Sequence, residues 1–253
     1  MVGGLELFKQ HFSVYAGQYM LIGGTACDLA MGEAGQTFRA TQDLDIVLCA
    51  EALTDEFIAA FWQFIREGQY QSREKSDGSK EFFRFRNPAI EGYPREIELF
   101  SRKPDMLTIP SDCTLTPIPA SEDVSSLSAI LLDEEYYSWI RQGDKEVDGI
   151  HIVGAEYLIP LKMKAWLDLS RRKAEGESID SRKIRKHPND VFRLFTILMI
   201  EPLVSVPLVV QQDVKKFMQK IESETIDFKN LGLGRLTMKD ALDGLSTVYG
   251  IGG

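Results

Sequence analysis

The strand-like patterns of this chain stop near residue 153, and this change constrains the fold more than any other feature of the sequence. Before it, short runs that alternate polar and apolar residues, which are typical of strands, are mixed with amphipathic helix patterns. After it, only helix patterns occur, near residues 156–173, 187–200, 209–223 and 237–248. We therefore predict an α+β domain over residues 1–153, followed by an α-helical domain over residues 154–253.

Local patterns predict the elements of the first domain. Helices are expected at residues 4–15, 25–34 and 54–68, the second with Thr25 as its N-cap. Strands are expected in the segments 18–24, 41–50, 80–88, 93–104, 126–132 and 148–153. A short connection that contains proline and glycine joins the segments 80–88 and 93–104, which predicts an antiparallel pair.

Charge and cysteine content exclude several kinds of protein. A net charge of −9 gives no overall electrostatic attraction to nucleic acid, so any such contact would have to be local. Three histidines without metal-ligand spacing argue against a structural zinc site. The cysteines are odd in number and widely spaced, which predicts reduced core thiols and no disulfide framework: Cys27, Cys49 and Cys113.

The sequence has the pattern of neither a membrane span nor a signal peptide. The most apolar run, residues 194–210, is interrupted by Glu201, Pro202 and Pro207, and so reads as a buried helix end followed by a turn. The N-terminus lacks a charged segment followed by an apolar one. We expect a cytoplasmic protein with no membrane partner.

Two aspartates one residue apart occur within the expected strand 41–50. On a strand, Asp43 and Asp45 project to the same face, where their like charges repel and partial burial makes the repulsion worse. A hard divalent cation, Mg²⁺ or Mn²⁺, would resolve this, because it favours carboxylate oxygens. Glu96 and Glu98 alternate in the same way on the expected strand 93–104. The alternative is that the aspartates form the solvated face of an edge strand.

A glycine turn precedes the acidic strand by one expected helix. Gly23, Gly24 and Thr25 follow a strand and open a helix, so their backbone amides and the threonine hydroxyl can face phosphate oxygens. Two adjacent glycines alone are more often simple turn chemistry. Combined with the acidic strand, they suggest a site in which one part binds phosphate and the other binds metal, as phosphoryl-type transfer requires.

The order Gly23-Gly24-Thr25, then Arg39-Ala-Thr41-Gln-Asp43-Leu-Asp45, resembles the DNA polymerase β-like nucleotidyltransferase superfamily, and within it the AbiEii-type nucleotidyltransferases. The resemblance implies a mixed sheet flanked by helices, followed by a helical C-terminal domain. It also implies that Asp43, Asp45 and a third carboxylate bind the metal. Glu98 in "IELF" matches that third position, where aspartate is commoner, and Glu96 is the alternative.

The resemblance also implies functional residues in the second domain. Lys162-Met163-Lys164-Ala165 matches a lysine motif of the family, and Lys162 would offset the charge of the triphosphate. Lys186 and Asp190 match a second motif, in which His187 stands where the family often has aspartate. Asp190 would orient the lysine or activate the acceptor, or else form a surface ion pair with Lys186.

Two basic features of the sequence each allow two interpretations. Arg39 is expected either to touch phosphate or to pair with Glu33. The run from Arg171 to His187 holds seven lysines and arginines against three acidic residues. Such a run between helices is usually a solvated loop, but it is also what an RNA-binding surface would look like.

The leading hypothesis is therefore a Mg²⁺-dependent (or Mn²⁺-dependent) enzyme that moves a nucleoside monophosphate from a nucleoside triphosphate (NTP) to a hydroxyl acceptor. The resemblance implies RNA or tRNA as the acceptor, and a toxin role with a cognate antitoxin as partner. One alternative is transfer to a small molecule of the aminoglycoside type. Another is a non-catalytic nucleotide-binding or protein-interaction module, although such a module would not need three carboxylates.

Overall fold

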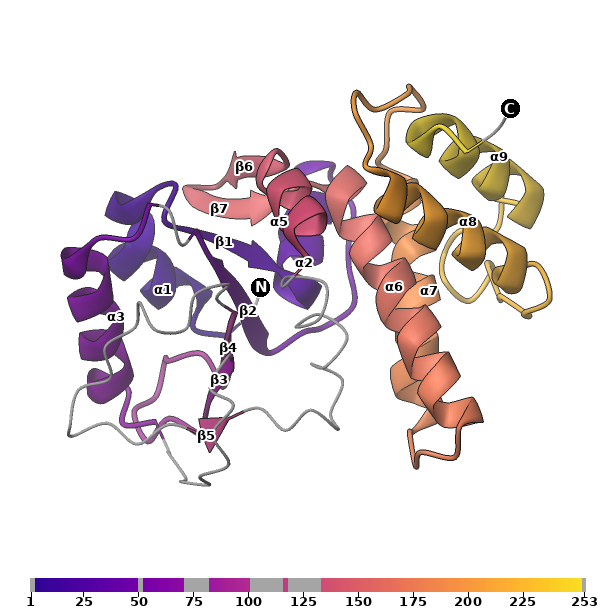
Figure 1. Ribbon diagram of the computed structural model, residues 1–253. Helices are drawn as coiled ribbons and strands as arrows, with labels where there is room; N and C mark the ends of the chain where they lie inside the picture. The colour runs from indigo at the N-terminus through magenta and orange to yellow at the C-terminus, as the bar shows by residue number, and fades with distance from the viewer. Residues whose placement is uncertain (1–2, 50–51, 71–81, 101–115, 118–132, 252–253) are drawn as a thin grey trace. The chain divides into compact units, whose positions relative to one another are not determined.

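The computed structural model describes residues 3–49, 52–70, 82–100, 116–117 and 133–251 (Figure 1). The chain divides into two compact units. The first unit comprises Met1–Val124 and Gly143–Gly154, and the second comprises Ser125–Gln142 and Ala155–Gly253.

A mixed sheet forms the first unit. In the described residues its strand order is β5-β3-β4-β2-β1-β7-β6, with parallel pairing between β2 and β4 and between β1 and β7. The other neighbouring strands are antiparallel. The strands are β1 (Tyr19–Ile22), β2 (Asp43–Leu48), β3 (Phe82–Arg86), β4 (Glu96–Phe100), β5 (Thr116–Pro117), β6 (Asp144–Val147) and β7 (Ile150–Val153).

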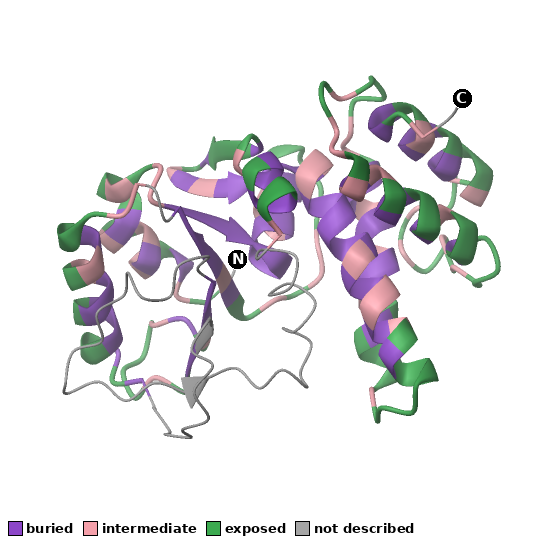
Figure 2. Cartoon of the chain, viewed as in Figure 1, coloured by how far each residue is buried: buried purple, intermediate pink, exposed green. Residues whose placement is uncertain are grey.

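Helices α1 (Leu5–Phe12), α2 (Gly23–Glu33) and α3 (Asp55–Glu67) flank this sheet (Figure 1). Thr54 caps α3, because its side chain accepts a hydrogen bond from the Phe57 backbone amide. Aromatic rings fill the space between α1, α3 and β1; for example, the rings of Phe12 and Phe64 meet edge to face, with their centroids 5.3 Å apart. The central strands are among the most buried parts of the chain, as Figure 2 shows for β1. The α+β class with a helix-flanked mixed sheet is confirmed.

Strand β6 was not expected from the sequence. Its residues, "DKEV", are mostly exposed and polar, so they lack the alternation that marks a half-buried strand. The turn that follows does carry a signal, since Asp148 and Gly149 both have positive φ angles, 51° and 74°. An Asp-Gly pair of this kind is typical of a tight β-hairpin, and it could have revealed β6. The expected strand over residues 126–132 lies outside the described residues.

The second unit is helical. It contains α5 (Glu134–Arg141), α6 (Ala155–Ala174), α7 (Ser181–Phe195), α8 (Leu208–Ile221) and α9 (Met238–Tyr249). α6 is buried along most of its length and exposed at its C-terminal end (Figure 2). Polar contacts join α5 to α6 and α8. Tyr136 of α5 donates to Asp213 Oδ2 of α8 at 3.0 Å, and Lys164 Nζ of α6 lies 2.8 Å from the same oxygen.

Two sequence expectations differ from these bounds. The expected helix near 187–200 begins earlier, at Ser181, where Asp180 accepts from the Arg182 amide as its cap. Pro188 lies inside this helix, although proline normally marks a helix start, so it obscured the pattern. In addition, α5 belongs to the second unit and not to the first. Among the residues that the structure describes, no helix is long and apolar enough to cross a membrane.

Candidate functional site

Two neighbouring strands carry the acidic residues that the sequence singled out. β2 and β4 pair in parallel, and their register sets Asp45 opposite Glu98 and Asp43 opposite Glu96. Because residues paired on adjacent strands point to the same face of a sheet, all four carboxylates share one face. The intervening residues of both strands are buried and apolar: Leu44, Ile46, Ile97 and Leu99.

The acidic face is not at the edge of the sheet. β2 lies between β4 and β1, so the interpretation of Asp43 and Asp45 as the solvated face of an edge strand is wrong. Asp43 is exposed, Asp45 is half-buried, and Glu98 is only 8% exposed. The carboxylates are thus increasingly withdrawn from water from Asp43 to Glu98, which makes their mutual repulsion costly.

Two arginines from β3 extend the acidic face. The antiparallel register sets Arg84 opposite Glu98 and Arg86 opposite Glu96. Arg84 Nε donates to Glu98 Oε1 at 2.7 Å, and its Nη2 lies 2.6 Å from the same oxygen. Arg86 Nε lies 3.0 Å from Glu96 Oε1. The sequence interpretation missed both arginines, although their alternation with phenylalanine on an expected strand was the signal that could have found them.

Burial and neighbouring charges set the protonation of Glu98. Burial raises the pKa of the Glu98 carboxyl, and the charge of Asp45 and a hydrogen bond with Asp45 raise it further, whereas Arg84 lowers it. The result is a pKa of about 9, compared with an ordinary value of 4.5. At neutral pH the metal-free protein therefore keeps a proton on Glu98.

The stability of the metal-free protein is expected to fall as pH rises above the ordinary pKa of Glu98. Folded Glu98 keeps its proton up to a pKa of about 9, whereas the unfolded chain releases it near 4.5. Its contribution to the free energy of unfolding is therefore fully present below pH 4.5 and is lost as pH rises through about 9. Urea unfolding in EDTA at a series of pH values measures this, and Glu98→Gln should flatten the slope. An unchanged slope in that variant would contradict the assignment.

The N-terminus of α2 packs directly against the acidic strand. A Cβ atom at Gly23 would lie 1.7 Å from Asp45 Oδ2, and Gly23 has a φ angle of +69°, a backbone conformation that favours glycine. A Cβ atom at Gly24 would lie 2.5 Å from Thr41 Oγ1. The two glycines are therefore more than a simple turn, because they allow the chain to approach the Asp45 carboxylate and Thr41 closely.

Gly23→Ala is expected to displace Asp45 as well as to strain the backbone. The positive φ costs an alanine about 1–2 kcal/mol of stability, and the new methyl group would overlap the Asp45 carboxylate. The matched control is Gly17→Ala, because Gly17 has a φ of +76° and open space around its Cβ position. Urea unfolding should show a larger loss for Gly23→Ala. Equal losses in the two variants would mean that Asp45 accommodates the methyl group.

Thr25 holds α2 to β2. The helix begins at Gly23 with Ile22 as its N-cap, so the prediction that Thr25 caps this helix is wrong. The side chain of Thr25 is fully buried, and its hydroxyl donates to the backbone carbonyl of Asp43 at 2.7 Å. A phosphate oxygen is an acceptor, so Thr25 would have to give up this bond in order to donate to a phosphate.

Arg39 lies half-buried on the segment before β2. One of its nitrogens is 3.5 Å from the carbonyl oxygen of Ala40, and its guanidinium carbon lies 5.3 Å from the centre of the Phe38 ring. The carboxylate of Glu33 contacts Lys145 Nζ at 2.6 Å. Contact of Arg39 with phosphate, or with Glu33, stays a prediction.

The carboxylates fit a hard divalent cation in chemistry and strand position. Asp45 lies opposite Glu98, and Asp43 lies two residues before Asp45 on the same face, so the residue types and the strand register suit a hard divalent cation. Within the described part of the chain, no three His, Cys, Asp or Glu side chains gather closely enough to hold an ion as they stand. The three predicted ligands thus match a metal site by residue type and register. Asp45 and Glu98 are hydrogen-bonded to each other, but no third such side chain of the described residues joins them closely enough to complete the site.

The second unit contains a buried ion pair between Lys162 on α6 and Asp190 on α7. Lys162 Nζ lies 3.4 Å from Asp190 Oδ2, and Arg193 Nη1 lies 3.7 Å from Oδ1. Asp190 is fully buried, so the alternative of a surface ion pair with Lys186 is wrong. The charge of Lys162 is offset within its own unit. Nucleotide binding by Lys162, Lys186 and Asp190 stays a prediction, as does a role for buried His187.

The basic run from Arg171 to His187 is largely helical. It covers the end of α6 and the beginning of α7, and only residues 175–180 lie between them. The expectation of a solvated loop is therefore wrong for most of the run.

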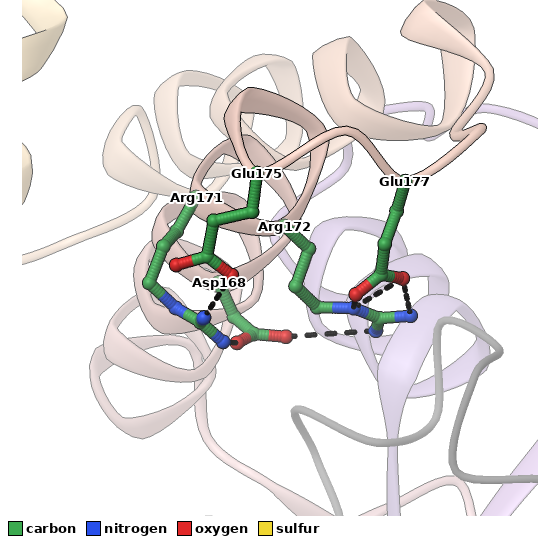
Figure 3. Close-up of polar contacts among 5 residues, drawn as sticks. All are labelled: Asp168, Arg171, Arg172, Glu175 and Glu177. Atoms are coloured by element: carbon green, nitrogen blue, oxygen red, sulfur yellow. Dashed lines mark hydrogen bonds and ion pairs between the residues drawn. The ribbon is translucent and has the colours of Figure 1, made fainter.

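The arginines at the end of α6 are paired with acidic neighbours (Figure 3). Arg171 contacts Asp168 at 2.8 Å and Glu175 at 2.6 Å. Arg172 contacts Glu177 at 2.6 Å and Asp168 at 3.7 Å. These contacts offset part of the positive charge that would attract an RNA backbone, and so they weaken the sequence argument for an RNA-binding surface.

Comparisons with known proteins find a similarity among solved structures. No protein-family model matches this sequence, and no curated protein matches it. Among solved structures, the chain is similar to an antigenic nucleotidyltransferase-like protein from Paracoccidioides brasiliensis, with 13% sequence identity and a TM-score of 0.47. The similarity covers 96% of this chain and 90% of that one.

Proposed function

We propose that this protein is a metal-dependent nucleotidyltransferase that moves a nucleoside monophosphate from an NTP to a hydroxyl acceptor. The observation that carries the proposal is the parallel register of β2 and β4, which sets Asp45 beside Glu98 while Gly23 approaches the Asp45 carboxylate. Neighbouring carboxyl groups that are partly buried cost stability, so they point to a function. In-line phosphoryl-type transfer with bound metal needs such a group.

Each part of this face has a role in the proposed reaction. Asp43, Asp45 and Glu98 would hold Mg²⁺ or Mn²⁺, which supplies positive charge against the phosphate oxygens when bound. The backbone amides at the start of α2, beside Gly23 and Gly24, would bind phosphate. With a divalent cation bound, Glu98 would be ionised, and it would then accept the proton of the attacking hydroxyl.

The test is incubation of the protein with each α-³²P-labelled NTP, with Mg²⁺ or Mn²⁺, and with either total tRNA or an aminoglycoside. Label should move to one acceptor in the presence of metal and should be absent with EDTA. Labelling of tRNA selects the RNA acceptor, and labelling of the aminoglycoside selects the small molecule. If neither acceptor is labelled, and calorimetry detects no NTP binding with Mg²⁺ present, the proposal fails in favour of a non-catalytic module.

The AbiEii-type motif extends the proposal to a toxin that acts on RNA and is held inactive by a cognate antitoxin. Induced expression of the chain should then arrest the growth of a host cell, whereas expression of Asp43→Asn should not. Arrest by both proteins would separate the toxicity from nucleotidyl transfer and overturn this extension.

A further inference from the structure

Arg84 is the most completely buried cation on the acidic face. It is 6% exposed, although it ends in a guanidinium that stays charged at every physiological pH. Arg86, two residues along the same strand, has a side chain that is 47% exposed. Burying an arginine costs stability unless acidic partners balance its charge. The contacts of Arg84 therefore identify the carboxyl groups that balance it.

The contacts of Arg84 join the two glutamates of β4. Its Nε lies 2.7 Å from Glu98 Oε1 and 2.9 Å from Glu96 Oε1, and its Nη2 lies 2.6 Å from Glu98 Oε1. Both contacts with Glu98 use the same oxygen. The planar guanidinium therefore fixes the direction of the Glu98 carboxyl group, which a flexible ammonium could not do as well.

The register places Arg84, Glu98 and Asp45 in one row across β3, β4 and β2. Arg84 is opposite Glu98, and Glu98 is opposite Asp45, so the arginine and the aspartate lie on either side of one carboxyl group. A cation bound near Asp45 and Glu98 would meet the positive charge of Arg84 close by. Like charges at such a distance repel, and burial strengthens the repulsion.

We propose that Arg84 is a positioning residue with two effects, in that it orients Glu98 toward Asp45 and acts as a built-in counter-cation that weakens the binding of divalent metal. The inference rests on the proposed function in taking Asp45 and Glu98 as metal ligands. It predicts that the two effects separate: loss of the Arg84 charge strengthens metal binding, whereas loss of its geometry slows the reaction.

The experiment compares Arg84→Gln, Arg84→Lys and Arg86→Gln with the unaltered protein. Mn²⁺ binding to the nucleotide-free protein is followed by electron paramagnetic resonance, and nucleotidyl transfer is measured separately. Arg84→Gln should bind Mn²⁺ about tenfold more tightly and yet transfer nucleotide at least about tenfold more slowly. Arg84→Lys should keep the Mn²⁺ affinity and lose rate. Arg86→Gln should change both by less than about twofold, because exposed charge is screened.

The outcomes are separable. A general defect in folding would weaken Mn²⁺ binding and rate together, so it cannot produce the expected gain in affinity. Unchanged or weaker Mn²⁺ affinity in Arg84→Gln overturns the proposal while leaving the proposed function intact. If Arg84→Gln does not fold, Arg84→Lys decides, and an unchanged rate there overturns the positioning role. If the unaltered protein neither transfers nucleotide nor binds Mn²⁺, the proposed function fails. In that case a gain of Mn²⁺ binding in Arg84→Gln supports the counter-cation role, and no gain overturns it.

Discussion

Asp45→Asn is expected to abolish nucleotidyl transfer while making the metal-free protein more stable. Asp45 is the carboxylate that touches both other parts of the site, because it lies opposite Glu98 and against Gly23. Asparagine has the same shape but no negative charge. Loss of one preorganised charge of this kind typically costs at least about 10²-fold in rate. The same change removes the charge that opposes ionisation of Glu98, so the gain in stability is expected above about pH 9, where Glu98 of the unaltered metal-free protein is ionised as well.

The rate is measured with the labelled NTP identified as the substrate, and the stability by thermal unfolding in EDTA. A gain of about 1 kcal/mol would raise the melting temperature by roughly 2–4 °C. The matched control is Asp148→Asn, which removes the same charge from a residue whose side chain is 71% exposed and paired with Lys9. This control should leave rate and stability nearly unchanged. Transfer that persists in Asp45→Asn would remove Asp45 from the proposed metal site.

Asp190→Ala is expected to destabilise the helical unit strongly. Both oxygens of this fully buried carboxylate lie near cations, Lys162 and Arg193, so alanine would leave the Lys162 charge buried without this partner. Removing one partner of a buried ion pair costs about 3–5 kcal/mol, whereas the intact pair itself contributes little. The melting temperature should fall by about 10 °C or more.

Asp243→Ala is the control in the same unit, because its side chain is 69% exposed and its pairing with Lys239, at 3.8 Å, is a surface contact. It should cost less than about 0.5 kcal/mol. Equal losses in Asp190→Ala and Asp243→Ala would show that burial of the Lys162 pair does not matter. The double variant Lys162→Met/Asp190→Leu should recover most of the stability, since it removes both charges. If it is stable but slow in transfer, the Lys162–Asp190 pair acts in the reaction as well as in the fold.

The acidic strands could be predicted because their signal is local. Alternation of aspartate or glutamate with apolar residues identifies one polar face and one buried face on each of the strands β2 and β4. The partners of these carboxylates depend on which strands become neighbours. The antiparallel pairing of β3 with β4 was predicted and is confirmed, but the Arg84 contact with Glu98 depends on the register of that pair, which neither segment of sequence displays.

The second unit shows the same limit for helices. Spacing along α7 suggested that Asp190 pairs with Lys186 one turn away, as it would on an isolated helix. Packing of α6 against α7 instead buries Asp190 and brings Lys162 from another helix to it. Sequence spacing describes neighbours on one helix surface, whereas burial is decided by the helix that covers that surface.

The return of the chain to the sheet after α5 has a consequence for synthesis and for fragment design. β7 supplies the parallel partner of β1, with Ile152 beside Leu21, yet it is made more than a hundred residues later. On the ribosome, β1 must wait for that partner until α5, a helix of the other unit, has already emerged. A fragment ending at residue 142 would lack β7 and expose one edge of β1. A fragment beginning after residue 153 would lack Tyr136, which donates a hydrogen bond to Asp213. We therefore expect that neither unit can be produced as a contiguous piece of the chain without losing part of its own structure.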